Sequence, residues 1–208
     1  MSCKSTWKAG LDDDPEPGDL YSSGQHTRLV GCEDILKIDK RLALFVGGTR
    51  SGKSDLAEAW LARYGQEATY LATLGGDDGG DARVARHRAR RPAWLSTVEL
   101  EEGSDLPALV AAARTPLLID SLGTWLVRFE DFRAPRQDFL DSLQDAKVPV
   151  AVVAELVGEG IHPPDGLSRS FVDAQGELTS AIRAIADEAY LVVAGACIAL
   201  VEPNWAGS

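Results

Sequence analysis

The fold of this chain is decided by one continuous stretch, Leu42-Ala43-Leu44-Phe45-Val46-Gly47-Gly48-Thr49-Arg50-Ser51-Gly52-Lys53-Ser54. An apolar run of strand length leads into a glycine-rich turn, and the turn opens directly into a helical pattern at 55–62. The last eight residues match the spacing G-x-x-x-x-G-K-[ST] of a phosphate-binding P-loop. A chance glycine turn is a poor explanation for four fixed positions between a strand and a helix. The stretch therefore predicts a nucleoside-triphosphate site.

The residue types in this turn suit a polyphosphate. Glycine lets the backbone curl so that successive N–H groups point at phosphate oxygens, and the following helix adds its partial positive charge. We expect Lys53 to reach the β- and γ-phosphates as a catalytic residue, and the hydroxyl of Ser54 to hold Mg²⁺. The whole turn is predicted to bind the nucleotide, ATP or GTP, through Gly47, Gly48, Thr49, Arg50, Ser51, Gly52, Lys53 and Ser54.

Composition excludes several classes of protein. A length of 208 residues allows one substantial core, or a domain with an extension. A net charge of −11 and a pI near 4.7 argue against a nucleic-acid-binding protein. The three cysteines lie far apart, which gives no metal framework and suits a reducing cytoplasm. No apolar run approaches the ~20 residues that cross a bilayer, and no signal-peptide pattern opens the chain. We therefore expect a cytoplasmic protein with no membrane span.

The chain divides near residue 40. Residues 1–40 contain an acidic, proline-containing segment at 12–19 with little to bury, which is typical of a flexible extension. An interaction tail is the other interpretation, and the residues do not decide between them. We expect 41–208 to form a single P-loop domain.

Apolar strand-length runs alternate with helical patterns from residue 41 onward. Runs that are apolar throughout are typical of parallel strands covered on both faces. The prediction is an α/β fold with a mostly parallel central sheet and helices on both faces. The expected strands are 42–46, 68–73, 95–98, 116–120, 148–154, 190–194 and 197–201, and the expected helices are 55–62, 81–90, 106–113, 122–132, 136–144 and 168–188.

A second acid is needed to complete a P-loop site. P-loop NTPases hold Mg²⁺ with an acid that ends an apolar strand, and we expect that strand to lie beside the P-loop strand. Asp120 follows the apolar residues 117–119 and meets this description. It also precedes a helical run together with Ser121, so a helix N-cap is the alternative. Because ligands bind at the carboxyl ends of parallel strands, both roles can hold.

An arginine-rich segment surrounds His87. Residues 83–91 contain five arginines in nine positions, inside an acidic chain. A solvated helix face paired with acidic residues explains this on charge alone. Clustered arginines such as Arg83 and Arg88 would also attract a polyphosphate, and neighbouring cations would keep His87 neutral and nucleophilic. Spacing by itself leaves both interpretations open, since a lone histidine is usually structural.

Several motifs together resemble a known family, the bifunctional adenosylcobinamide kinase/adenosylcobinamide-phosphate guanylyltransferases of cobalamin biosynthesis. The resemblance spans about 41–201. It rests on the P-loop 47–54, on the Asp81-Ala82-Arg83-Val84 and His87-Arg88 segment that ends at Arg91-Pro92, and on 118–126, and it resumes at 157–163 and 186–195. The P-loop alone is shared by many NTPases, whereas its combination with the His-Arg-x-x-Arg-Pro run is far more specific.

The resemblance implies a RecA-like P-loop fold and two reactions. A nucleoside triphosphate would phosphorylate the hydroxyl of adenosylcobinamide, and GMP from GTP would then pass to the new phosphate through a histidine, which here is His87. A covalent intermediate on histidine divides the difficult direct transfer of GMP from GTP to another phosphate, which is a reaction between two anions, into two easier steps. The resemblance also implies a homo-oligomer, since members of the family form trimers. The residues themselves add Arg83, Arg88 and Asp120 to the predicted nucleotide-binding set and make Ser54 and Asp120 the predicted Mg²⁺ ligands.

The chain departs from the family pattern in its C-terminal half. Glu155-Leu156 replaces the usual Asn-Glu after the apolar strand, Thr179-Ser180 replaces an Asn-Gln pair, and Arg128 falls near a usual Asn. Two alternatives therefore stay open beside the bifunctional enzyme. One is a simple small-molecule kinase or NTPase in which His87 is structural. The other is a degenerate P-loop protein that binds nucleotide without turnover.

Overall fold

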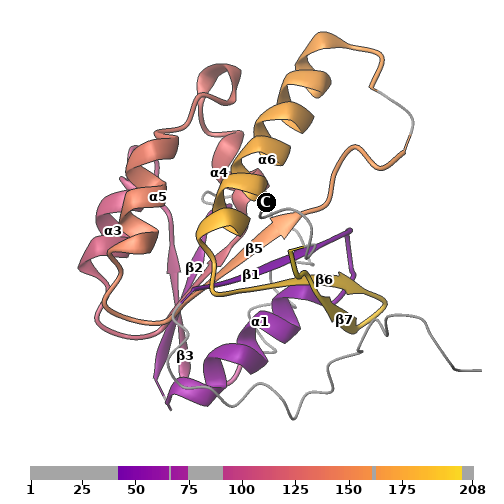
Figure 1. Cartoon of the computed structure of the whole chain (residues 1–208). Coiled ribbons are helices and arrows are strands. Elements are labelled where there is room, and N and C mark those ends of the chain that lie inside the picture. The colour runs from indigo at the N-terminus through magenta and orange to yellow at the C-terminus, as the bar shows by residue number, and fades with distance from the viewer. Residues whose placement is uncertain (1–41, 66, 75–90, 161–162, 203–208) are drawn as a thin grey trace, which may run out of the picture.

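The computed structural model describes residues 42–65, 67–74, 91–160 and 163–202 (Figure 1). The predicted N-terminal extension and the predicted helix 81–90 lie outside these described residues.

A single sheet forms the centre of the described structure. Its seven strands run in the order β3-β2-β4-β5-β1-β6-β7. Every neighbouring pair is parallel except the β6–β7 pair, which is antiparallel. This confirms the predicted mostly parallel sheet. The strands are β1 (Leu42–Gly47), β2 (Ala68–Ala72), β3 (Leu95–Glu99), β4 (Leu117–Asp120), β5 (Val150–Glu155), β6 (Glu188–Val193) and β7 (Ala196–Ala199).

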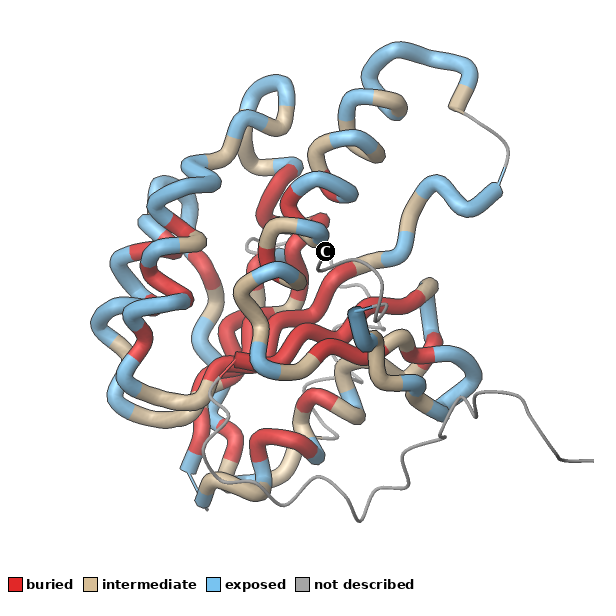
Figure 2. Tube along the Cα trace, viewed as in Figure 1, coloured by how far each residue is buried: buried red, intermediate tan, exposed pale blue. Residues whose placement is uncertain are grey.

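Helices cover both faces of this sheet. Figure 1 shows α1 on one face and α3, α4, α5 and α6 on the other, and Figure 2 shows the buried residues gathered between these layers. The helices are α1 (Lys53–Leu61), α3 (Leu106–Ala112), α4 (Leu122–Leu126), α5 (Arg136–Gln144) and α6 (Gly166–Ile185), with 3₁₀ turns η2 (Ala62–Tyr64) and η3 (Glu130–Phe132). The architecture is the predicted α/β arrangement.

β1 is apolar throughout because successive residues pack into different hydrophobic clusters, one on each face of the sheet. Leu44 and Val46 belong to the buried cluster beneath α3 to α6, whereas Ala43 and Phe45 belong to the cluster beneath α1. Side chains alternate between the two faces of a pleated strand, so a strand covered on both sides needs apolar residues at every position. The same alternation holds in β5, where Val150 to Ala154 are fully buried.

The predicted helix 122–132 is wrong in its second half. α4 ends at Leu126, and Phe129 is extended with φ −111° and ψ 139°. The N–H of Phe129 donates to the carbonyl of Leu126 at 3.1 Å, which is a turn hydrogen bond. Its ring packs edge-on against Trp125 at 5.4 Å between ring centroids. Phe132 lies beyond the break and packs against Phe171 of α6 at 5.3 Å. The break thus ties the end of α4 to the long helix.

The prediction also extends the last helix, expected at 168–188, too far. α6 stops at Ile185, because Ala186 adopts an extended ψ of 137° and the chain enters β6 at Glu188. Glu188 is held there by the indole N–H of Trp60, which donates to its Oε2 at 2.7 Å. A tertiary contact to α1 therefore fixes a boundary that helical periodicity places elsewhere.

The packing beneath α5 gives a test of the core. Phe139 is fully buried and lies 4.7 Å from the ring of Trp125. Phe139→Ala should lower the free energy of unfolding by about 3–5 kcal/mol, because it removes a buried ring and leaves a cavity. Denaturant unfolding followed by fluorescence measures this. Leu167→Ala is the control: Leu167 is 66% exposed, so its loss should stay within about 0.5 kcal/mol. Equal effects of the two variants would contradict the described core.

Candidate nucleotide-binding site

The turn between β1 and α1 has the geometry of a phosphate cradle. Arg50 and Gly52 both take positive φ values, 60° and 93°, which curl the backbone. The N–H of Ser51 donates to the carbonyl of Gly48 at 3.2 Å and closes the turn. α1 begins at Lys53 without a side-chain cap from Gly52. The N–H groups of its first turn, which have no intrahelical partner, can therefore receive an anion.

The cradle is packed tightly from below. A Cβ on Gly47 would lie 2.5 Å from Ser51 Oγ and 2.6 Å from the backbone oxygen of Val192 in β6. The N–H of Gly195, in the β6–β7 turn, donates to the carbonyl of Ser51 at 2.8 Å. The C-terminal hairpin therefore braces the loop, and glycine is required at position 47 because there is no room for a side chain.

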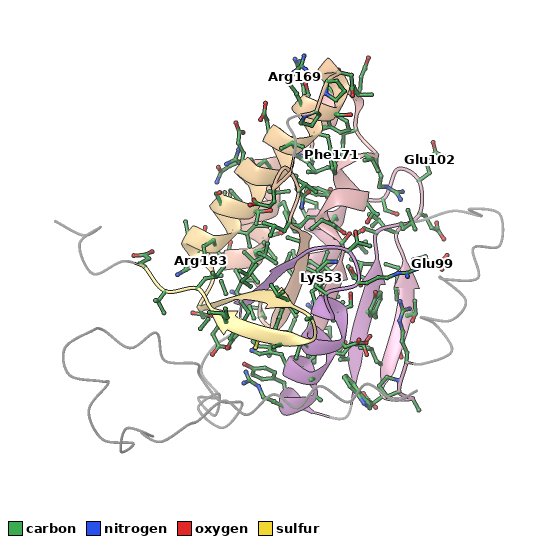
Figure 3. All side chains as sticks on the ribbon, turned by 90° about the vertical axis from the view of Figure 1, so that its right-hand side faces the viewer. Lys53, Glu99, Glu102, Arg169, Phe171 and Arg183 are labelled. Atoms are coloured by element: carbon green, nitrogen blue, oxygen red, sulfur yellow. The ribbon has the colours of Figure 1, made fainter. Side chains whose placement is uncertain are left out.

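The polar side chains of Lys53 and Ser51 in the cradle have different surroundings. Lys53 stands at the start of α1 (Figure 3), and its Nζ donates to the carbonyl of Gly48 at 3.4 Å. Ser51 Oγ is buried and has no hydrogen-bond partner among the described residues. This Oγ lies on the packed side of the loop, where a Cβ on Gly47 would meet it at 2.5 Å. Thr49 and Arg50 are exposed at the tip of the loop.

Asp120 lies at the carboxyl end of β4 and faces α1. The expectation that its strand lies beside the P-loop strand is wrong, because β5 is inserted between β4 and β1. α1 bridges the gap: the hydroxyl of Ser54 donates to Asp120 Oδ2 at 2.8 Å. The N-cap of α4 is Ser121, in a capping box with Thr124. The carboxylate of Asp120 therefore faces the P-loop rather than capping the helix.

Ser54 and Asp120 fit a magnesium ion that arrives with a nucleotide. Both supply hard oxygen ligands, and Mg²⁺ is usually held by one or two carboxylates plus substrate phosphates. Within the described ranges, no group of three or more His, Cys, Asp or Glu side chains could hold a metal alone. The residues present thus suit a metal–nucleotide complex and not a separate metal cage.

Sequence reasoning missed two residues of the site, Tyr70 in β2 and Thr73 directly after β2. The phenol of Tyr70 donates a hydrogen bond to Asp120 Oδ2, and burial, followed by the nearby Asp120 charge, raises the pKa of this phenol. Thr73 is fully buried and accepts from the N–H of Ser121 at 2.7 Å, which links the end of β2 to the start of α4. Neither residue carries a motif. Both read as part of an apolar strand.

A further acid ends the inserted strand. Glu155 pairs in register with Gly47 of the P-loop, and its Oε2 accepts from the N–H of Gly123 at 3.0 Å. A carboxylate directly after a fully apolar strand is the signal that identified Asp120. The same signal at Glu155 could have placed it at this edge of the sheet.

The remaining predicted site residues, Arg83, His87 and Arg88, lie outside the described residues. The structure therefore brings together the P-loop 47–54 and Asp120, and it gives no position for the histidine or its arginines.

Two features define the class of protein. A P-loop follows a central parallel strand, and its serine is hydrogen-bonded to an acid on a strand that lies beyond one inserted strand. The chain has a RecA-like P-loop NTPase fold. A family model described as cobinamide kinase / cobinamide phosphate guanyltransferase matches residues 43–200. The chain belongs to this family, whose members are transferases.

Three relatives agree with this assignment. The bifunctional adenosylcobalamin biosynthesis protein CobP of Pseudomonas aeruginosa is 37% identical over 162 residues, which cover 73% of this chain and 92% of the relative. The protein of the same description named CobU is 32% identical over 175 residues in Escherichia coli, covering 74% and 96%. CobU of Salmonella typhimurium is 31% identical over 177 residues, with the same coverage. These matches favour the bifunctional enzyme over the alternatives of a simple kinase or a binding protein.

A more distant similarity is to a solved structure. The flagellar accessory protein FlaH of Methanocaldococcus jannaschii aligns over 73% of this chain and 70% of its own, at 11% identity and a TM-score of 0.43. This similarity is too low to add to the assignment. Separately, among the residues that the structure describes, no helix is long and apolar enough to span a bilayer.

The packing under the P-loop gives a prediction that needs no nucleotide. Gly47→Ala should lower the free energy of unfolding by about 1–3 kcal/mol, because the added methyl group would collide with the backbone of β6. Denaturant unfolding of the ligand-free protein measures the effect. The neighbouring Gly48→Ala is the matched control, since a Cβ there meets nothing within 4 Å. Equal stability of the two variants would show that Gly47 is not confined as described.

Proposed function

We propose that this protein catalyses two successive transfers in cobalamin biosynthesis. It phosphorylates adenosylcobinamide with a nucleoside triphosphate, ATP or GTP, and it then transfers GMP from GTP to adenosylcobinamide phosphate through a guanylylated histidine, His87. The observation that carries the proposal is the 2.8 Å contact of Ser54 Oγ with Asp120 beneath a P-loop, in a chain that matches this family over 43–200.

The first transfer uses the described site. The N–H groups of the P-loop and the Nζ of Lys53 would bind the β- and γ-phosphates and offset the charge that moves onto the leaving diphosphate. The corrinoid hydroxyl oxygen attacks the γ-phosphorus, the bond between this phosphorus and the β,γ-bridging oxygen breaks so that the nucleoside diphosphate leaves, and the hydroxyl proton passes to solvent. Bound Mg²⁺ would neutralise charge on the β- and γ-oxygens, with Ser54 and Asp120 as its protein partners.

The second transfer uses His87. A neutral imidazole nitrogen attacks the α-phosphorus of GTP and pyrophosphate leaves, which gives a phosphoramidate. An oxygen of the corrinoid phosphate then attacks this phosphorus, the N–P bond breaks, and a diphosphate linkage forms. Arg83 and Arg88 are proposed to bind the nucleotide phosphates, and clustered guanidinium groups would also keep His87 unprotonated.

The proposed partners follow from these reactions. They are GTP or ATP and the corrinoid, with no nucleic acid, in keeping with the net charge of −11. We also propose a homo-oligomer, a trimer by resemblance to the family, and a cytoplasmic location, which suits three scattered cysteines.

Lys53→Ala tests the P-loop assignment. Loss of the ammonium group should abolish triphosphate binding or turnover, because this group is proposed to bind the β- and γ-phosphates and to offset the charge that moves onto the leaving diphosphate. Equilibrium binding of a fluorescent triphosphate and the rate of corrinoid phosphorylation measure this. Lys147→Ala is the control, since Lys147 is an exposed lysine just before the start of β5, at the opposite end of the strand from Glu155. If Lys53→Ala were as active as the control variant, the assignment of residues 47–54 as a phosphate-binding P-loop would be wrong.

His87→Ala tests the second transfer. After incubation with α-³²P-GTP and denaturation, the wild-type protein should keep an acid-labile, base-stable label, and His87→Ala should carry none. The chain has three histidines, so His26→Ala and His162→Ala are natural controls that should label normally. Label that persists in His87→Ala, or disappears in either control, would reject His87 as the GMP acceptor. Phosphorylation of the corrinoid should survive in His87→Ala.

A further inference from the structure

The carboxylate of Asp120 is held by more than the P-loop serine. Its Oδ2 accepts hydrogen bonds from two hydroxyl groups, that of Ser54 at 2.8 Å and that of Tyr70. Ser54 comes from α1, whereas Tyr70 comes from β2, the strand on the other side of β4 from β5. The acid is therefore fixed between two elements that the chain brings to it independently.

Tyr70 is itself held rigidly. Its side chain is 5% exposed and lies in the buried cluster beneath α1. The guanidinium of Arg91 covers its ring at 3.4 Å from the centroid, and Arg91 Nη1 donates to Thr97 of β3 at 2.6 Å. A cation over the ring face adds an electrostatic attraction to the packing. The ring is thus held both by its packing and by its cation contact, and its hydroxyl donates to Asp120 Oδ2.

The phenol acts as a donor in this contact. A phenol carries one proton and a carboxylate oxygen can only accept, so the hydroxyl of Tyr70 donates to Asp120 Oδ2. Charge-assisted hydrogen bonds of this kind are stronger than neutral ones. The contact is therefore suited to fix the orientation of the carboxylate.

This orientation matters for a magnesium ion. While the single proton of Ser54 Oγ points at Asp120, the oxygen lone pairs of Ser54 are left for a metal. Mg²⁺ demands near-ideal octahedral geometry and tolerates little misplacement of its ligands. Residues that orient metal ligands from the outer shell typically change metal affinity by 10–100-fold when they are mutated.

We propose that Tyr70, clamped by Arg91, is a positioning residue that holds Asp120 in the orientation needed to bind Mg²⁺ with the nucleotide. This inference rests on the proposed function, because it takes Ser54 and Asp120 as the metal site. It adds a residue from β2 that neither the P-loop motif nor the arginine-rich segment includes.

Tyr70→Phe tests the inference, because it keeps the buried ring and removes only the hydroxyl. The main readout is the dissociation constant of Mn²⁺ from the protein–GTP complex, measured by the loss of the free Mn²⁺ electron paramagnetic resonance signal and corrected for Mn²⁺ bound by free GTP. It should rise by roughly 10-fold, while metal-free GTP binding stays as in the wild type. Excess Mg²⁺ should then restore the phosphorylation rate.

Tyr190→Phe is the matched control. Tyr190 is also buried, at 7% exposure in the same cluster, but it stacks on Phe45 at 5.3 Å. It should leave the Mn²⁺ dissociation constant unchanged. An unchanged or tighter Mn²⁺ affinity in Tyr70→Phe, or a rate that excess Mg²⁺ does not restore, would overturn the inference. A wild-type protein that binds no Mn²⁺ with GTP would instead overturn the proposed metal site itself.

Discussion

The hydrogen bond between Ser54 and Asp120 joins the two halves of the site, and the arrangement of the sheet makes it possible. Ser54 belongs to the helix that follows β1, and Asp120 ends β4, with β5 inserted between these strands. α1 must lie across the inserted strand for the hydroxyl to reach the acid. The buried residues Ala57, Trp60 and Leu61 on α1 fix that position, because they pack onto the sheet face formed by Phe45, Ala151 and Val153.

The edge of the sheet around this bond is fixed from three sides. The N–H of Gly195 in the β6–β7 turn donates to the P-loop, and the hydroxyl of Tyr70 in β2 donates to Asp120. The N–H of Ser121 at the start of α4 donates to Thr73. None of these contacts is local in sequence. A site built from so many separate segments needs a rigid sheet beneath it, and the fully buried strands β1 and β5 provide one. Rigid elements hold reacting groups more accurately than loops do.

Sequence reasoning predicted the fold well and part of the site. The strands were recognisable because burial on both faces demands apolar residues at every position, and the P-loop because phosphate binding demands fixed glycines. Tyr70 could not be recognised, since a buried tyrosine is ordinary in a strand and only strand order reveals its partner. The end of α4 depended on the packing of Phe129 and Phe132, which helical periodicity does not contain. Strand order also placed β5 between the P-loop and Asp120, against expectation.

The most direct test of the account is a crystal structure of the protein with Mg²⁺ and a non-hydrolysable GTP analogue. The account predicts the β- and γ-phosphates on the N–H groups of 48–54, and Mg²⁺ between the phosphates and Ser54 Oγ on the side of Asp120. Phosphates bound elsewhere on the protein, or a metal out of reach of both Ser54 and Asp120, would contradict it.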